Sequence, residues 1–432
     1  MKIVIAPDSF KGSLTASQVC DIAANAAREV FPDAAVQKLP LADGGEGTAE
    51  ALMNVLPGEI RTLQVRGPLG TPVTARYGIV PSALTASVRE TPEHPLPKTK
   101  IAIMDMAGAS GLTLVAEAER DVFHSNTFGT GEMILDAISQ GCGHIYLGLG
   151  GSATSDGGMG MAAALGAVFR DENGMPLDPV PASMHRIAAV DVSRLNPAVS
   201  RIPITVMSDV KNPLLGPEGA VYVYGPQKGI PAERLAEMDQ AMAHYIDCVE
   251  SALPKKSIRH APGSGAAGGL GAGLLAFTRS EISSGIETVL ELLKFDACLE
   301  SADLVITGEG RMDFQSAYGK VVAGVAAHCK THQIPCFALA GSIEDGAEAL
   351  YDFGISGMMP LVDRIESLDS AIRDAEKNCF RAAVRLLRIV KAGMEVRGGI
   401  EGLRFCRHPE YKKERAPIRM AQLGINENSD NF

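Results

Sequence analysis

The sequence predicts an α/β protein built around a largely parallel sheet, and two observations lead to this fold class. Short runs rich in Val and Ile recur along the chain, and each gives way to a loop rich in Gly, Ser and Asp and then to a helical pattern. This alternation is typical of βα units. The length of 432 residues is enough for two or three domains. We therefore expect more than one domain.

The first βα unit opens the chain. Residues 3–6 are a short apolar strand, residues 7–14 a loop, and residues 15–31 carry apolar side chains at helical spacing before Pro32. Thr15 and Gln18 have the spacing of a capping box. We expect the first helix to begin at this pair.

Strand-then-loop junctions of the same kind recur at residues 36–46, 144–156, 203–213, 303–313 and 335–342. Each loop is expected at the carboxyl end of its strand, where α/β folds bind their ligands.

One stretch breaks this rhythm. Residues 60–66 and 73–80 flank a turn rich in Gly and Pro, and the second run alternates apolar with polar side chains. This pattern predicts an antiparallel hairpin and hence a second, mixed α/β domain. We place that domain at residues 67–285, inserted into an α/β domain formed by residues 1–66 and 286–390.

Composition excludes several classes of protein. Forty Lys and Arg against 51 Asp and Glu give a net charge of −11, which argues against a nucleic-acid surface. The longest nearly uncharged apolar run, residues 266–277, is too short to span a membrane. The apolar start of the chain is too short for the core of a signal peptide. We expect a cytoplasmic protein that binds no nucleic acid and no membrane.

Residues 391–432 differ from the rest of the chain. They hold eight Lys and Arg against six Asp and Glu and show no apolar period. We expect a poorly ordered C-terminal extension, with a docking peptide as the functional alternative.

The segment from His144 to Gly158 is the most informative. A strand leads into a loop of small residues and then into a helix, so backbone N–H groups and the positive end of a helix would meet where an anion could bind. Glycine allows close approach of a phosphate, and the hydroxyls of this loop add donors. A tight turn needed only for packing is the alternative.

Four acidic loops lie at predicted strand ends, at residues 8–13, 43–48, 208–213 and 308–316. Phosphoryl transfer needs carboxylates for Mg²⁺, a carboxylate to accept a hydroxyl proton, and Lys or Arg to neutralise the transferred group. A single Asp-Gly turn is usually structural. Four such loops at one edge of a sheet favour a catalytic interpretation.

Two further motifs are weak. Residues 263–268 fit G-x-G-x-x-G, but the preceding residues make a poor strand, so a close-packed loop is the better interpretation. His328 and His332 lie four apart on a predicted helix, where an exposed helix end is favoured over a zinc site. The sequence contains no P-loop, H-R-D or G-x-S-x-G motif.

Several of these loops together give a specific resemblance. The chain resembles the bacterial class I glycerate kinases, a family that phosphorylates D-glycerate with ATP, and the resemblance covers residues 1 to about 388. The matching stretches are residues 6–14, 42–48, 128–132, 148–158, 209–216, 226–229, 308–315 and 319–320. Asp105 departs from the pattern, because a Glu is expected before Met106-Ala107.

The resemblance implies a two-domain α/β enzyme, with one flavodoxin-like or Rossmann-like domain, one mixed domain, and the active site in the cleft between them. It implies Mg²⁺ and ATP as cofactors, D-glycerate as substrate and 2-phosphoglycerate as product, the reaction of a glycerate 2-kinase. A homodimer is left open.

Chemistry suggests roles for individual residues. Glycerate carries a carboxylate, so we expect Arg311 to clamp it, with Lys11 sharing the clamp or meeting the transferred phosphate. Asp8 or Asp43 would orient the hydroxyl and take its proton. The remaining candidates are Glu46 and Lys320 for catalysis, Asp209 and Asp313 for Mg²⁺, and Gly150, Gly151, Ser152, Thr154, Ser155 and Asp156 for the nucleotide phosphates.

Two other functions remain as alternatives. Another small-molecule kinase, of the GHMP or sugar-acid type, would share the glycine-rich loop at 148–158. A sugar-acid sensor on the same scaffold would bind its ligand without consuming ATP.

Overall fold

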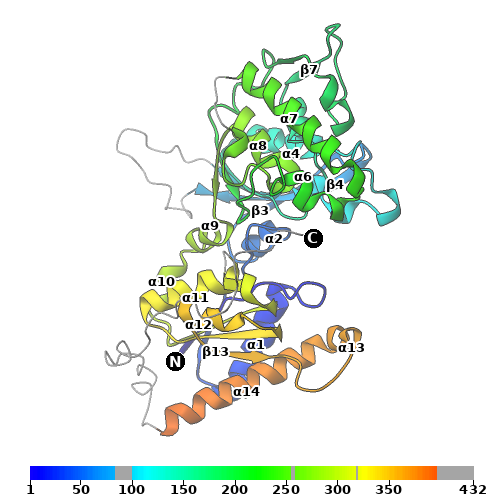
Figure 1. The fold of residues 1–432 in the computed structure, drawn as a ribbon. Helices are drawn as coiled ribbons and strands as arrows, with labels where there is room; N and C mark the ends of the chain where they lie inside the picture. The colour runs from blue at the N-terminus through cyan, green and yellow to red at the C-terminus, as the bar shows by residue number, and fades with distance from the viewer. Residues whose placement is uncertain (83–99, 254–257, 318–319, 397–432) are drawn as a thin grey trace, which may run out of the picture. The chain divides into compact units, whose positions relative to one another are not determined.

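The structure, a computed structural model, describes the chain except for residues 83–99, 254–257, 318–319 and 397–432 (Figure 1). The chain divides into two compact units, Met1–Leu387 and Arg388–Phe432. All the strands that the structure describes lie in the first unit, and so do all the residues proposed for the site.

The first sheet is five-stranded and entirely parallel, as predicted. Its order is β13-β12-β11-β1-β2, from strands β1 (Lys2–Ile5), β2 (Ala35–Lys38), β11 (Leu304–Met312), β12 (Cys336–Ile343) and β13 (Ile355–Pro360). From β1 the chain moves outward to β2, whereas from β11 it moves outward in the other direction. The strand order therefore reverses between β1 and β11, and such a point is where open α/β sheets bind ligands.

The second sheet is six-stranded and mixed. Its order is β10-β9-β6-β5-β4-β3, from strands β3 (Glu59–Arg66), β4 (Pro72–Pro81), β5 (Lys100–Asp105), β6 (Cys142–Gly148), β9 (Pro203–Met207) and β10 (Arg279–Ser283). The first four strands of that order are parallel, and β4 pairs antiparallel with both β5 and β3. The predicted hairpin is confirmed, and with these two sheets so is the α/β fold class.

Hydrogen bonding places β3 in the six-stranded sheet, although its sequence was assigned to the other domain. The predicted domain limits stay a prediction. A separate two-stranded sheet joins β7 (Val168–Arg170) to β8 (Ala189–Asp191).

The first helix begins where the sequence predicts. In α1 (Ala16–Val30), the Thr15 hydroxyl accepts from the Gln18 N–H at 3.2 Å, and the Gln18 side chain accepts from the Thr15 N–H at 2.9 Å. The other helices are α2 (Thr48–Met53), α3 (Ala107–Ser110), α4 (Phe128–Ser139), α5 (Met159–Ala164), α6 (Ala220–Tyr224), α7 (Leu235–Ala252), α8 (Ala266–Phe277), α9 (Gly285–Leu292), α10 (Phe295–Leu299), α11 (Val321–His332), α12 (Leu350–Phe353), α13 (Leu368–Arg373) and α14 (Ala375–Val396).

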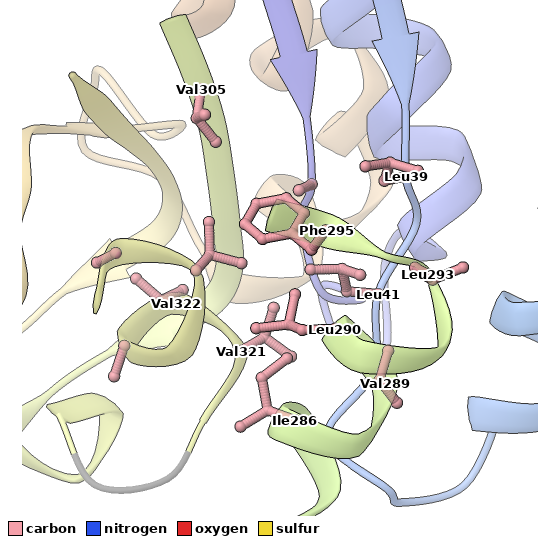
Figure 2. Close-up of a cluster of buried hydrophobic side chains, with 14 of the residues drawn as sticks. Leu39, Leu41, Ile286, Val289, Leu290, Leu293, Phe295, Val305, Val321 and Val322 are labelled. Atoms are coloured by element: carbon pink, nitrogen blue, oxygen red, sulfur yellow. The ribbon is translucent and has the colours of Figure 1, made fainter. Parts of the chain in front are cut away.

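One apolar cluster supports the loops that follow the parallel strands. Figure 2 shows side chains of α9 and α11 packed with those of the adjoining loops and of β11. Leu290 of α9 lies beside Val321 of α11, and Val289 and Val322 are buried in the same cluster. Burying side chains of this size stabilises the fold by about 1.5–3 kcal/mol each. The cluster holds α9 firmly beside the carboxyl ends of both sheets.

The G-x-G-x-x-G motif is not a dinucleotide fingerprint, because a short 3₁₀ turn (Ile258–His260) and not a strand precedes it. The motif instead enters α8 through three consecutive residues with positive φ, namely Ala267 at 52°, Gly268 at 66° and Gly269 at 87°. Such a left-handed run is rare outside glycine. It turns the chain sharply beside the loop after β6.

The C-terminal extension begins later than predicted. Helix α14 continues to Val396, so residues 391–396 are helical and the expectation of poor order is wrong there. Its buried apolar side chains recur at helical spacing up to Val390, and the exposed last turn follows them. The remainder of the predicted extension, residues 397–432, lies outside the described residues. Within the part of the chain that is described, no helix is both long and apolar enough to cross a bilayer.

Candidate active site

One large cavity is lined by loops from both sheets. Its volume is about 760 Å³, within the range of about 300–1,000 Å³ usual for small-molecule sites. Its walls come from the loops after β1, β2, β6 and β9, from the starts of α1 and α8, from α2 and from Lys320. Of the predicted site residues, those that line it are Asp8, Lys11, Asp43, Glu46, Gly150, Gly151, Asp209 and Lys320.

Asp8 lies at the point where the strand order of the parallel sheet reverses. Its N–H donates to the Gly308 carbonyl of β11 at 2.8 Å, and its own carboxylate accepts from the Ser9 N–H at 2.6 Å. Burial raises the pKa of Asp8 to about 7, with a further contribution from the charge of Asp43. A carboxylate with such a pKa is suited to exchange a proton near neutral pH.

Asp43 occupies a turn that fits tightly against the start of α9. Gly44 and Gly47 have φ of 85° and 91°, which glycine tolerates without strain. A Cβ on Gly285 would come within 1.9 Å of the Asp43 carbonyl oxygen. Only glycine at 285 therefore allows this approach.

Asp209 is held by the same helix start. Its Oδ1 accepts from the Ser284 hydroxyl at 2.8 Å and from the Gly285 N–H at 3.0 Å. Its Oδ2 is buried and has no hydrogen-bond partner among the described residues. Burial raises the pKa of Asp209 to about 6, and the charge of Asp43 adds to that shift. Gly285 thus contacts the Asp43 carbonyl and donates to the Asp209 carboxylate, so it links these two residues of the cavity.

Glu46 lies against the Gly150-Gly151 turn. A Cβ on Gly150 would come within 2.4 Å of the Gly45 Cα, and one on Gly151 within 2.8 Å of the Glu46 Oε2. The Glu46 Oε1 accepts from the Thr113 hydroxyl at 3.2 Å. The two glycine-rich turns therefore touch, and side chains on the second would push the first away.

Two lysines supply the positive charge of the cavity. Lys11 is exposed, and the Lys320 ammonium lies 4.0 Å from the Glu309 Oε2. Glu309 is buried, and its Oε1 has no hydrogen-bond partner among the described residues. Burial raises the pKa of Glu309. Anionic groups of a ligand would meet both lysines. Glu309 belongs to a predicted loop but was not assigned a role from the sequence.

Comparison with known proteins agrees with this arrangement. The glycerate kinase family matches residues 3–391. This chain belongs to the glycerate kinase family. It is 42% identical over 381 residues to the glycerate kinase of Halalkalibacterium halodurans, covering 88% of this chain and 96% of that one. It is 41% identical over 398 residues to the glycerate 2-kinase of Escherichia coli, covering 92% of this chain and 100% of that one.

A solved structure of the glycerate kinase family has the same fold. The crystal structure assigned as glycerate kinase 2 from Salmonella typhimurium LT2 is 40% identical, with a TM-score of 0.78, and the match covers 91% of this chain and 99% of that chain. The resemblance stated from the sequence is thereby confirmed.

Other predicted residues of this glycerate kinase family member lie elsewhere. Arg311 and Asp313 line a separate cavity of about 370 Å³ with Phe314, Glu344 and Asp345. The Arg311 guanidinium lies 2.7 Å from Glu344 and 3.4 Å from Asp313. The structure therefore does not bring Asp313 together with Asp209, and the roles of Arg311 and Asp313 stay predictions.

The polar side chains of the loop after β6 are buried behind the cavity. Asp156 accepts from four donors, and burial raises its pKa. The hydroxyls of Thr154 and Ser155 are fully buried and bond to none of the described groups. Ser152, Thr154, Ser155 and Asp156 do not line the large cavity, so their predicted phosphate contacts stay predictions.

The histidines on α11 form ion pairs. The two ring nitrogens of His328 lie 2.7 Å from Asp296 and 3.1 Å from Glu287, and the Nε2 of His332 lies 3.0 Å from Asp296. Hydrogen bonding to Glu287 and Asp296 raises the pKa of His328 to about 9. No group of three or more His, Cys, Asp or Glu within the described ranges is arranged to hold a metal ion. These contacts favour a structural role.

Asp105 supports the site from behind, although the sequence indicated only that it replaces the Glu expected before Met106-Ala107. Its carboxylate accepts from the Gly47 N–H at 3.0 Å and from the Ala49 N–H at 3.2 Å, so it holds the turn that carries Asp43 and Glu46 against the end of β5. Burial raises the pKa of Asp105 to about 7. Its position directly after an apolar strand was the signal available in the sequence.

Proposed function

We propose that this protein transfers the γ-phosphoryl group of ATP to the C2 hydroxyl of D-glycerate, giving 2-phosphoglycerate and ADP. The observation that carries the proposal is the shared cavity in which Asp8, Asp43 and Asp209 face Lys11 and Lys320. The choice of the C2 hydroxyl draws on the relative from Escherichia coli, which is named glycerate 2-kinase.

The two lysines account for the charge of the reactants. Glycerate brings one carboxylate and ATP brings a triphosphate, so a site that binds both needs positive charge near each. We assign the glycerate carboxylate to Lys11 and the transferred phosphate to Lys320. Arg311 would join the carboxylate only after leaving Glu344 and Asp313, to which it is paired.

Two carboxylates of the cavity are assigned to the hydroxyl group of the substrate. Asp8 is the preferred acceptor for the hydroxyl proton, because burial brings its pKa to about 7. Positioning and charge neutralisation contribute more than the base does, since phosphoryl transfer passes through a loose transition state. Asp43 lies close enough to shift the pKa of both Asp8 and Asp209, so it can orient the substrate between them.

The donor set fits Mg²⁺. This ion keeps several waters and usually takes one or two protein carboxylates together with phosphate oxygens. Asp209 presents a buried Oδ2 that no described group satisfies, and Asp43, which also lines the cavity, is close enough for its charge to raise the pKa of Asp209. When bound, Mg²⁺ would neutralise charge on the phosphates.

A coupled assay for ADP formation with a panel of hydroxy acids tests the proposal, with Mg²⁺ omitted as the control. We expect D-glycerate to be the best acceptor and enolase to convert the product directly. Faster turnover of a sugar or sugar acid would favour another small-molecule kinase. Glycerate binding without ADP formation would favour a sensor.

A further inference from the structure

Lys228 is a charged side chain buried outside the large cavity. It ends the short 3₁₀ turn Pro226–Lys228 and is 2% exposed. Burying an ammonium group is costly unless hydrogen bonds compensate it. Residues 226–229 are one of the stretches that resemble the glycerate kinases, but the reaction proposed above gives Lys228 no role.

The partners of Lys228 both lie in the loop after β6. Its Nζ donates to the Ser152 hydroxyl at 2.7 Å and to the Thr154 carbonyl at 2.6 Å. Gly150 and Gly151, which line the cavity, come directly before these partners. Lys228 therefore holds the loop from behind, on the side away from the cavity.

The Thr154 carbonyl also meets the left-handed turn that opens α8. A Cβ on Gly268 would come within 2.0 Å of this oxygen, and the Gly268 carbonyl accepts from the Gly157 N–H at 3.0 Å. Ala267, next to Gly268, lines the cavity. The oxygen that Lys228 holds is thus the contact between two cavity walls.

Asp156 anchors the other end of the loop. It accepts from the Thr127 N–H and hydroxyl, both at 2.8 Å, and from the Gly160 N–H at 2.9 Å. The half of the loop near Gly150 is held by two backbone hydrogen bonds, from the Leu112 N–H to the Gly151 carbonyl at 2.7 Å and from the Ala153 N–H to the Ser110 carbonyl at 2.9 Å, and by the buried ammonium of Lys228. Without it, the Thr154 carbonyl and the Ser152 hydroxyl would lose a buried donor, and the loop would rearrange to find another.

We propose that Lys228 is a positioning residue for nucleotide binding, which fixes the cavity walls at Gly150–Gly151 and Ala266–Ala267 against which the triphosphate of ATP lies. This inference rests on the proposed function for the identity of the ligand. Loss of Lys228 should weaken nucleotide binding more than glycerate binding, because Lys11 and Asp8 belong to other loops.

The test compares three variants of the full chain. Lys228→Met keeps the length of the side chain and removes its donors, and Ser152→Ala removes one acceptor. Lys330→Met is the control, because the Lys330 ammonium is exposed and donates to the Asp352 carbonyl at 2.6 Å, remote from the cavity lining. Circular dichroism and thermal melting report folding. Calorimetry reports the affinity for a non-hydrolysable ATP analogue with Mg²⁺, and steady-state kinetics give both KM values.

For Lys228→Met we expect a folded protein whose Kd for the analogue and KM for ATP rise about 10-fold or more, the size of one lost buried hydrogen bond. The KM for glycerate should change less than about 3-fold. Ser152→Ala should weaken nucleotide binding about 2- to 5-fold, and Lys330→Met less than 2-fold. A folded Lys228→Met with unchanged nucleotide affinity, or with equal rises in both KM values, overturns the inference.

If Lys228→Met does not fold, Ser152→Ala decides, since unchanged nucleotide affinity in that variant also overturns the inference. The wild-type protein separates this inference from the proposed function. Binding of the analogue without glycerate turnover refutes the proposed function alone, and the variants still test Lys228. No binding of the analogue by the wild type overturns the positioning role itself.

Discussion

Two glycine-rich turns meet at the cavity, and they use their residues in opposite ways. The turn at residues 43–47 directs the carboxylates of Asp43 and Glu46 toward the cavity, and the loop at residues 150–156 buries its polar side chains and exposes only the glycines. The first turn is a source of charge, whereas the second is a shaped backbone surface. Similar composition therefore conceals different functions.

The supports of the two turns differ accordingly. Residues 43–47 are held by backbone donors to Asp105 and by close contact with Gly285. The loop at 150–156 is held by the buried side chains of Lys228 and Asp156, in addition to backbone hydrogen bonds with Ser110 and Leu112. We expect side-chain changes in the first turn to affect chemistry and those in the second to affect binding.

Asp43→Asn should have the largest effect on activity and should show most clearly that the two turns differ. It removes charge at the reacting end of the cavity without changing shape, so kcat should fall about 100-fold or more. Ser155→Ala, in the other loop, should change kcat less than about 5-fold because that hydroxyl is buried. Steady-state kinetics with matched circular dichroism measure both. Equal losses would show that both turns act through their side chains.

Gly285→Ala should reduce kcat/KM by about 10- to 100-fold, because the new Cβ would displace the Asp43 turn and disturb the donor to Asp209. Gly108→Ala is the control, since its Cβ would meet no described atom outside its own helix and chain neighbours nearer than 3.8 Å. Full activity in Gly285→Ala would mean that the position of the turn does not matter for catalysis.

Asp8 links activity to pH. In its proposed role as the base, Asp8 must be ionised, and its pKa is raised to about 7, so kcat/KM should fall about 10-fold per pH unit below that value. The same raised pKa makes the folded protein retain a proton that the unfolded chain releases, so this group destabilises the fold as pH rises from about 4 to 7. Asp8→Asn should therefore lose activity and yet melt about 2–5 °C higher at pH 8. An unchanged or lower melting temperature would contradict the charge burial on which its role depends.

Substitution of His328 should have the smallest effect, and this effect is on stability. His328 pairs with Glu287 of α9, the helix that supports the first turn. Its pKa is raised to about 9 by Glu287 and Asp296, so its contribution is complete below the unfolded value of 6.5 and disappears as pH rises through 9. His328→Gln should lower the free energy of unfolding by about 0.5–1 kcal/mol at pH 7 and by nothing at pH 10.5. Denaturant melts at both pH values measure this, with His124→Gln as an exposed control. A loss that persists at pH 10.5 would assign the effect to packing.

Local patterns predicted much of the fold. The capping box at Thr15 and the hairpin at residues 60–80 are short-range features, and both are confirmed. The end of α14 was missed because none of residues 391–395 is buried, so the apolar period of Leu386, Leu387 and Val390 stops before the helix does. Apolar periodicity marks the buried part of a helix and not its exposed last turn.

The site was harder to predict, because spacing along the chain does not say which way a side chain points. The sequence placed Asp209 and Asp313 together on chemical grounds, yet one lines the large cavity and the other the small one. It also took Ser152 and Thr154 as ligand groups, although both partner Lys228 from within the core. The position of Lys228 beneath this loop is a tertiary feature. Its hydrogen bonds to Ser152 and Thr154 join residues that are 76 and 74 positions apart in the chain, which local patterns do not reveal.

The pairing of β1 with β11 has a consequence for synthesis of the protein. Ile5 pairs with Ile306, and the Lys2 N–H donates to Asp303 at a separation of 301 residues. A ribosome adds about 5–20 residues per second, so the amino-terminal strand waits about 15–60 s for its neighbour to emerge. During that interval its edge is open to wrong partners. A nascent chain stalled before β11 should therefore engage chaperones and remain inactive, because Lys320 of the cavity follows β11 in the chain.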